Sequence, residues 1–329
     1  MSNADCYASP IVSPIQDIVD LQSKSLQQYK QIELPSALDA PRDTFSTIHL
    51  KDISYYADGP EGSRPMLLLH SINAAPSAYE MKPLFEHYRQ TRRVYAPDLP
   101  GFGFSDRSSR KYSPELYANA IAAFLTNIVK EPADVIAFSL SCEFAARAAL
   151  VSAERFNTLT LLSPTGFGNR KLPSHNTSRR LHRIFTLPGL SEGLYRLLTK
   201  RAGVRYFMRK SYVGEPPQEL IDYAYATSHQ PGARHAPYYF LSGQLFTANA
   251  VDVIYSKLRL PVLVLYDRDA NVSFERLPEM LNQYQNWQAV RIEPTLGIPQ
   301  WERPTLSIQA IDNFLLQAQA QESNPSAGN

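Results

Sequence analysis

The hydrophobic positions of the chain form short continuous runs that alternate with longer helical patterns. The runs occupy residues 64–70, 92–98, 133–139, 156–164, 260–267 and 287–294. Helical periodicity occurs between and after them, at 76–89, 114–129, 141–152, 274–285 and 305–318. Because the runs are continuous rather than alternating in polarity, they predict strands that are buried on both faces. The pattern indicates an α/β fold with a mostly parallel central sheet flanked by helices.

The two ends of the chain carry other signals. Residues 45–58 predict two short strands joined by a tight turn at Lys51-Asp52. Further upstream, Ser13, Pro14 and Gln16 form a helix-start signal with an N-cap, a proline at the first helical position and a capping box. The last residues, "QESNPSAGN", have the composition of a disordered tail.

One long interval interrupts the alternation of strands and helices. Residues 168–257 show helical spacing, as at Leu181, Ile184 and Phe185, without a strand-like run. An insertion at the carboxyl edge of a parallel sheet lies where such folds bind ligands, so we interpret this interval as a helical cap between the sixth and seventh core strands. The expected division is an N-terminal extension (1–44), a first core segment (45–167), the cap (168–257), a second core segment (258–318) and a tail (319–329).

Composition and charge narrow the class of protein. The chain has 329 residues, of which 44% are hydrophobic and 19% charged, and its net charge is only +2. Neither a signal peptide nor an apolar run of about 20 residues is predicted, and Cys6 and Cys142 cannot form a disulfide framework. We therefore expect a cytoplasmic protein. No metal-ligand or cofactor motif is predicted, and nucleic acid is not an expected partner.

The positive charge is concentrated in the cap. Residues 170–210 contain eleven Lys or Arg residues, and their single acidic residue is Glu192. Apolar residues are interleaved at helical spacing, which is typical of a basic amphipathic surface. Such a surface suits peripheral binding to an anionic membrane, an acidic partner or an anionic substrate. The alternative is a solvated face that is neutralised by acids elsewhere in the fold.

Five segments, in this order, resemble the α/β-hydrolase fold. They are "LLLHSINAAPSAYEMKPL", "VYAPDLPGFGFSDR", "DVIAFSLS", "PVLVLYDRDANVSF" and "GIPQWERP". The resemblance covers residues 45–318 apart from the cap. It implies a nucleophile elbow at Ser139, with the glycines of that motif replaced by Ala137 and Ser141, which are also small. An ordinary strand-to-helix turn with a capping serine is the alternative interpretation.

The resemblance also assigns the groups around the nucleophile. It implies an oxyanion hole made by the N–H groups of Leu140 and Ile72. His70, Ser71, Phe138 and Tyr239 are expected to line the substrate site, with His70 shaping the oxyanion loop rather than acting as the base. Cys142 is expected to be a small buried side chain and not a nucleophile.

The acid and the base each have two candidates. Asp269 is favoured as the catalytic acid, and Asp267 remains an alternative. The position of the family's catalytic histidine is occupied by Gly297, and no histidine follows the candidate acids. A substitute base could come from the cap, where His235 and His229 are candidates, because a base need only reach the nucleophile in space.

These features support three functional hypotheses. The first is a serine hydrolase with an incomplete catalytic triad, which acts on an ester or related acyl bond of a hydrophobic small molecule or lipid. The second is a catalytically impaired homologue that binds a ligand or protein. The third is a lyase or isomerase that uses the oxyanion hole without an acyl-enzyme. The presence of Ser139 favours the first, whereas Gly297 favours the others.

Overall fold

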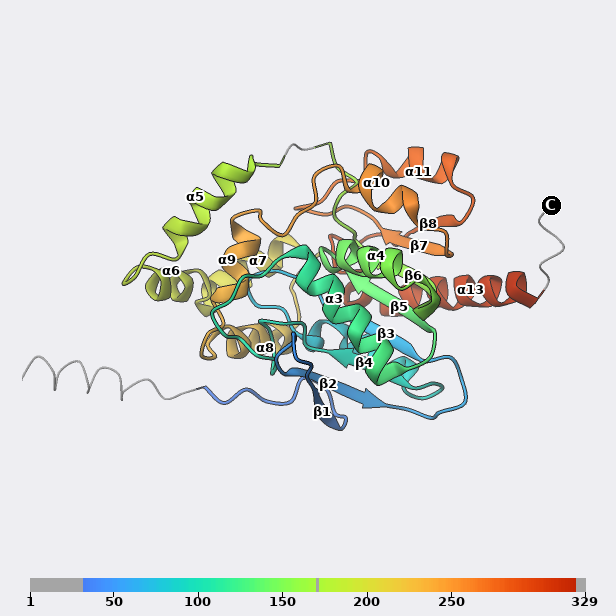
Figure 1. Ribbon diagram of the computed structural model, residues 1–329, viewed down its shortest axis with the longest axis horizontal. Helices are drawn as coiled ribbons and strands as arrows, with labels where there is room; N and C mark the ends of the chain where they lie inside the picture. The colour runs from blue at the N-terminus through green and yellow to red at the C-terminus, as the bar shows by residue number, and fades with distance from the viewer. Residues whose placement is uncertain (1–31, 170–171, 324–329) are drawn as a thin grey trace, which may run out of the picture. The chain divides into compact units, whose positions relative to one another are not determined.

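The computed structural model describes residues 32–169 and 172–323. The described residues from Leu34 onward form one compact unit. Its centre is an eight-stranded sheet with the order β1-β2-β4-β3-β5-β6-β7-β8, in which β2 pairs antiparallel with β1 and β4, and the other neighbours, from β4 to β8, pair parallel (Figure 1). The strands are β1 (Arg42–Phe45), β2 (Ile53–Asp58), β3 (Met66–Leu69), β4 (Val94–Pro97), β5 (Ala133–Phe138), β6 (Phe156–Leu162), β7 (Val262–Tyr266) and β8 (Trp287–Arg291). The fold class predicted from the sequence is confirmed.

The central strands are apolar on both faces, as the continuous runs predict. In β3, Leu67 and Leu69 belong to one hydrophobic cluster, whereas Met66 and Leu68 belong to the other. Successive side chains of a strand point to opposite faces, so these two clusters are the two sides of the sheet. Both sides therefore need a covering layer of helices.

The helices supply these two layers. Core residues of α3 (Pro114–Phe124), α4 (Ser141–Val151) and α11 (Leu277–Gln283) belong to the first cluster, and those of α2 (Lys82–Tyr88) and α13 (Pro304–Ser323) belong to the second. Figure 1 shows α3 and α4 side by side over the strands. Short helical segments complete the core: η1 (Ala78–Met81), η2 (Leu125–Val129), η3 (Ala153–Arg155), α10 (Ala250–Val253), η4 (Tyr255–Lys257) and α12 (Pro299–Glu302).

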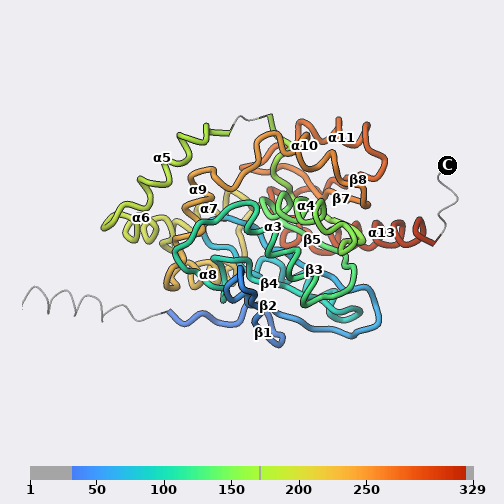
Figure 2. Tube along the Cα trace, in the orientation of Figure 1, coloured from blue at the N-terminus to red at the C-terminus, as the bar shows by residue number. Residues whose placement is uncertain are grey.

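The cap lies between β6 and β7, where the sequence predicts it. It contains α5 (His175–Phe185), α6 (Ser191–Leu198), α7 (Arg201–Lys210), α8 (Gln218–Ser228) and α9 (His235–Leu241). Figure 2 follows the chain from β6 through these helices and back to β7. Phe185 of α5 stacks on Tyr238 of α9, with ring centroids 5.4 Å apart, so the outlying α5 is packed against the rest of the cap.

Two expected boundaries and one expected turn need correction. Residues 34–44 belong to the core rather than to an extension, because Ala37 and Leu38 are buried and β1 begins at Arg42. The connection between β1 and β2 spans residues 46–52, so it is longer than a tight turn. Helix α13 continues to Ser323, beyond the start of the expected tail, and the Arg64–Glu322 ion pair ties its end to the core. The helix expected after Ser13 lies outside the described residues.

Candidate functional site

Ser139 lies at a sharp turn between the central strand β5 and helix α4. Its φ is +56°, in the left-handed region that non-glycine residues rarely adopt, and its N–H donates to the Leu162 carbonyl of β6 at 2.9 Å. Ala137 and Ser141, two positions away on either side, are fully buried. Ser139 is half-buried, so the residue keeps some access to solvent. This backbone has the form that a nucleophile elbow requires.

Two backbone N–H groups, one directly after Ser139 and one in the loop that follows β3, are available as donors. Leu140 is the N-cap residue of α4, and Ile72 lies in the loop that follows β3. Within the described residues, neither N–H donates a hydrogen bond, although both residues are buried. Buried backbone donors usually have a partner, so this pair suits an oxyanion hole, and the N-terminus of α4 favours negative charge.

Ser141 joins the elbow to the loop after β3. Its hydroxyl donates to the His70 carbonyl oxygen at 2.5 Å. The sequence identifies this residue only as a small replacement for glycine, whereas the structure gives its side chain a partner 71 positions away. The position of the loop relative to Ser139 therefore depends on this serine.

His70 has a structural environment. Its Nε2 accepts the Leu99 N–H at 2.8 Å, so the proton lies on Nδ1, which donates to the Ser71 carbonyl at 2.6 Å. Burial lowers the pKa of His70, which keeps the ring neutral. Both ring nitrogens are occupied and the residue is fully buried, so His70 shapes the loop from beneath.

Glu80 holds the other side of the same loop, and sequence reasoning missed it. Its carboxylate accepts hydrogen bonds from the Ser71 N–H at 2.8 Å, the Ser71 hydroxyl at 3.0 Å and the Asn73 side chain at 3.1 Å. Burial raises the pKa of Glu80 to about 7, although these donors act against the increase. The Glu80 carbonyl also accepts from Trp301 Nε1 at 2.8 Å, which links the loop to the segment that contains Gly297.

Asp269 faces Gly297, the position where the resemblance places a histidine. A Cβ atom at Gly297 would lie 2.8 Å from Asp269 Oδ2, and the φ of Gly297 is +130°. The other oxygen, Oδ1, accepts the N–H groups of Asn271 at 2.7 Å and Val272 at 3.1 Å. Burial raises the pKa of Asp269 to about 6. The carboxylate therefore occupies the space beside residue 297, and no cation pairs with it among the described residues.

Asp267, the alternative acid, is engaged elsewhere. Its two oxygens accept hydrogen bonds from Arg291 Nε at 2.7 Å and from the Thr295 N–H at 2.9 Å. Burial opposes ionisation, but these two donors outweigh it and lower the pKa of Asp267. Asp267 thus joins the ends of β7 and β8, and Asp269 is the acid that faces the position of the missing histidine.

Neither cap histidine that the sequence suggested hydrogen-bonds Ser139 in the described structure. His229 Nδ1 lies 2.8 Å from the Tyr225 carbonyl at the end of α8. His235 is the first residue of α9 and is half-buried. Burial is the main cause that lowers the pKa of both rings, so both are neutral near pH 7.

A third cap histidine carries no signal in the sequence. The ring of His182, on α5, lies 4.0 Å from that of Tyr239, which is one of the expected substrate-site residues. Its Nε2 is buried and has no hydrogen-bond partner among the described residues, and burial lowers its pKa. Tyr239 itself is half-buried and contacts Tyr112, whereas Ser71 and Phe138 are buried. No sequence motif marks His182, because its partner on α9 is distant in the sequence and the two side chains meet only after the cap has folded.

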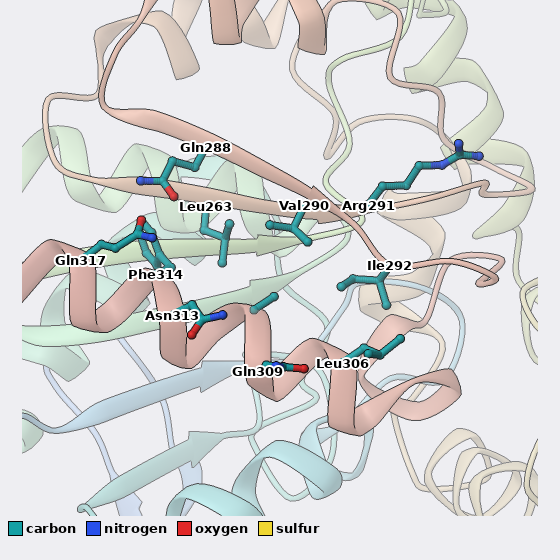
Figure 3. Close-up of a pocket in the computed structure, with 11 residues that line it drawn as sticks. Leu263, Gln288, Val290, Arg291, Ile292, Leu306, Gln309, Asn313, Phe314 and Gln317 are labelled. Carbon is teal, nitrogen blue, oxygen red and sulfur yellow. The ribbon is translucent and has the colours of Figure 1, made fainter.

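A surface groove lies apart from these residues. It runs between the edge strand β8 and helix α13, where Gln288, Val290 and Asn313 are among the side chains that line it (Figure 3). None of the expected site residues lines this groove. We therefore assign it no part in the chemistry of Ser139.

Comparison with known proteins agrees with the fold. The chain is 26% identical over 104 residues to 2-hydroxymuconate semialdehyde hydrolase of Pseudomonas sp. (strain CF600), an alignment that spans 31% of this chain and 37% of that relative. A crystal structure of a membrane phospholipase A matches with a TM-score of 0.65 and 20% identity over 93% of this chain and 94% of the other. An esterase from Thermogutta terrifontis matches with a TM-score of 0.65 and 19% identity over 85% of this chain and 99% of the other.

These structural matches establish a shared architecture. None of the described helices has the length and apolar character needed to cross a membrane. The sequence profile that describes the alpha/beta hydrolase family matches residues 66–304, which include β3 to β8, Ser139 and Asp269. The chain belongs to the alpha/beta hydrolase family.

Proposed function

We propose that this protein is a serine hydrolase that cleaves an ester or related acyl bond of a hydrophobic small molecule or lipid. The observation that carries the proposal is the left-handed backbone of Ser139 at +56°, followed directly by the Leu140 N–H, which donates no hydrogen bond within the described residues. A fold can make a strand-to-helix turn without such strain, which typically persists at functional sites. The membrane phospholipase A and the esterase that share the architecture support this class of reaction.

The reaction would begin with attack of Ser139 Oγ on the acyl carbon. The hydroxyl proton passes to a base, and the carbonyl oxygen becomes an oxyanion that the Leu140 and Ile72 N–H groups stabilise. Collapse of this intermediate expels the alcohol, which takes the proton back, and leaves an acyl group on Ser139. Water then attacks the acyl-enzyme by the same path and releases the acid.

The base of this mechanism does not come from residue 297, which is a glycine. Removal of a triad histidine lowers turnover about 10⁶-fold in the enzymes where it has been measured, and the oxyanion hole and binding alone leave about 10³-fold over water. We propose that a cap histidine supplies the base, with His235 and His229 as the candidates from the sequence. His182 joins them because its neutral ring has an unpartnered, buried Nε2.

Labelling with a fluorophosphonate probe tests the nucleophile. We expect the wild-type protein to be labelled and to hydrolyse activated esters of increasing acyl length, and we expect Ser139→Ala to do neither. Ser163→Ala is a matched control, because Ser163 also follows a buried strand with a positive φ, +42°, but precedes no helix. Equal labelling of the wild type and Ser139→Ala would refute the proposal.

Single substitutions then identify the base. His182→Ala, His229→Ala and His235→Ala are compared by the rate of labelling between pH 5 and pH 9 (about the range in which a histidine titrates). The base is the residue whose loss removes the rise in rate with pH. If all three variants keep that rise, none of these histidines is the base.

A second function is favoured by one observation at Gly297. The Asp269 carboxylate occupies the space that a side chain at residue 297 would need. A histidine could not be restored there without movement of the carboxylate. This geometry supports the alternative function, in which the protein binds a ligand or partner at the site around Ser139 without hydrolysing it. In that case a folded wild-type protein gives no labelling and no ester turnover.

A further inference from the structure

The cap helices α5, α6 and α7 expose both apolar and basic side chains. On the solvent face of α7, Tyr206 and Phe207 are each more than half exposed, and Lys210 Nζ lies 4.5 Å from the centre of the Tyr206 ring. Leu197 of α6 is 58% exposed. We call the following residues the outer cap surface: Arg179, Arg180, Arg183, Ile184, Leu187, Leu190, Leu197, Tyr206, Phe207 and Lys210.

Part of the positive charge of the cap is neutralised by acidic residues of α8 and of the loop that precedes it. On α7, Arg201 pairs with Asp222 and Arg209 pairs with Glu215, while Arg205 donates to Gln218. These arginines are spaced four residues apart, so they share one face of the helix. The predicted alternative of a neutralised basic face therefore holds for this side of α7.

Among the described residues, the arginines of α5 have no such partners. Arg179, Arg180 and Arg183 are exposed, and in the described structure none of them forms an ion pair or a hydrogen bond through its side chain. The opposite side of α5 packs inward through Phe185 and His182, which contact α9. Helix α5 is thus held by one face and presents guanidinium groups on the other.

We propose that the outer cap surface docks on an anionic lipid membrane. Its basic residues would meet the anionic headgroups, and the exposed side chains of Leu197, Tyr206 and Phe207 would enter the interfacial layer. Tyr206 and Lys210 suit this layer because each has an apolar body and a polar end, and Phe207 adds an apolar ring. The charge complementarity selects the lipid as the occupant, because an isologous dimer through the same surface would bring like charges together. This proposal does not rest on hydrolysis by Ser139.

Vesicle sedimentation of the full chain tests the proposal. Vesicles of phosphatidylcholine alone are compared with vesicles that contain phosphatidylglycerol, at low and at high salt. We expect binding to the anionic vesicles that weakens as salt is added. The triple variant Arg179→Gln/Arg180→Gln/Arg183→Gln should bind on the order of 100-fold more weakly, at about fivefold for each basic residue.

A matched pair of double variants tests the apolar side chains. Tyr206→Ser/Phe207→Ser should weaken binding, whereas Val151→Ser/Leu316→Ser should bind as the wild type does, because those exposed residues lie on α4 and α13. Ser139→Ala should also bind normally, which separates this proposal from the proposed function. Circular dichroism shows that each variant is folded.

Three results would overturn the membrane proposal. One is equal binding to neutral and anionic vesicles. Another is wild-type affinity in the arginine triple variant and in Tyr206→Ser/Phe207→Ser. The third is the absence of vesicle binding together with a wild-type dimer in light scattering that is lost in these variants. The surface would then join two copies of the chain.

Discussion

Asp269→Asn should make the protein more stable at alkaline pH. The Asp269 carboxylate is half-buried beside Gly297, and burial raises its pKa from 3.8 to about 6. This pKa difference means that folding is about 3 kcal/mol less favourable with the carboxylate ionised than with it protonated. Solvent screening reduces this free energy to about 1–2 kcal/mol. An asparagine keeps an oxygen for the N–H groups of Asn271 and Val272 but carries no charge. We therefore expect a gain of about 1–2 kcal/mol at pH 8.

The pH dependence gives the sign of the effect. A raised pKa in the folded state means that the contribution of Asp269 to stability is fully present below its ordinary pKa of 3.8 and is lost as the pH rises through about 6. Urea unfolding of the wild type and of Asp269→Asn at pH 5 and pH 8 measures it. The difference between the two proteins should be larger at pH 8. No gain at pH 8, or an equal gain at both pH values, would show that the carboxylate has a counter-charge in solution.

Asp267→Asn provides the contrast at the end of the same strand. The pKa of Asp267 is lowered, because the Thr295 N–H and Arg291 outweigh the effect of burial. Its contribution to stability is therefore present above the ordinary pKa and is lost as the pH falls through the lowered value. Asp267→Asn should destabilise the protein at pH 8 by about 2 kcal/mol, opposite in sign to Asp269→Asn. The two variants together separate the local charge effect from a general effect of the substitution.

Three further outcomes follow from single residues. Ser139→Gly should raise the free energy of unfolding by about 1 kcal/mol, because glycine adopts a φ of +56° without strain, and should abolish probe labelling. Glu80→Leu should lower the free energy of unfolding by about 2 kcal/mol and slow the labelling of Ser139, because the Ser71 N–H loses its buried acceptor. An unchanged rate of labelling would show that Glu80 does not position the oxyanion loop. Cys142 should resist iodoacetamide in the folded protein and react in urea, because it is buried and burial raises the pKa of its thiol.

The sequence predicted the sheet well because local patterns determine it. Each continuous apolar run became a strand, and each is short enough to end near a turn or polar residue. The boundaries near the ends were less predictable. Residues 34–44 lack a periodic pattern, and their place in the core depends on distant partners, such as the Tyr56 hydroxyl that accepts the Ala37 N–H at 2.9 Å.

The site was predictable only where a motif carries it. Ser139 was found because the elbow joins a strand and a helix that are adjacent in sequence, and Gly297 because a fixed spacing precedes Glu302-Arg303-Pro304. Glu80 carries no comparable signal. Its role depends on Ser71 and Trp301, which lie 9 and 221 positions away, and such contacts exist only after folding.

The energetics of Ser139 and Asp269 bear on whether the site still has a role. A non-glycine residue in the left-handed region costs about 1–2 kcal/mol. A half-buried carboxylate that pairs with no cation among the described residues adds a cost of similar size at neutral pH. The sheet needs neither feature, since a glycine would make the turn after β5 and an asparagine would keep the loop bonds of Asp269. Local rules that are broken without a gain in packing are typical of functional sites. If Ser139→Gly and Asp269→Asn are both more stable than the wild type, the strain at this turn and the charge beside Gly297 serve binding or catalysis rather than folding.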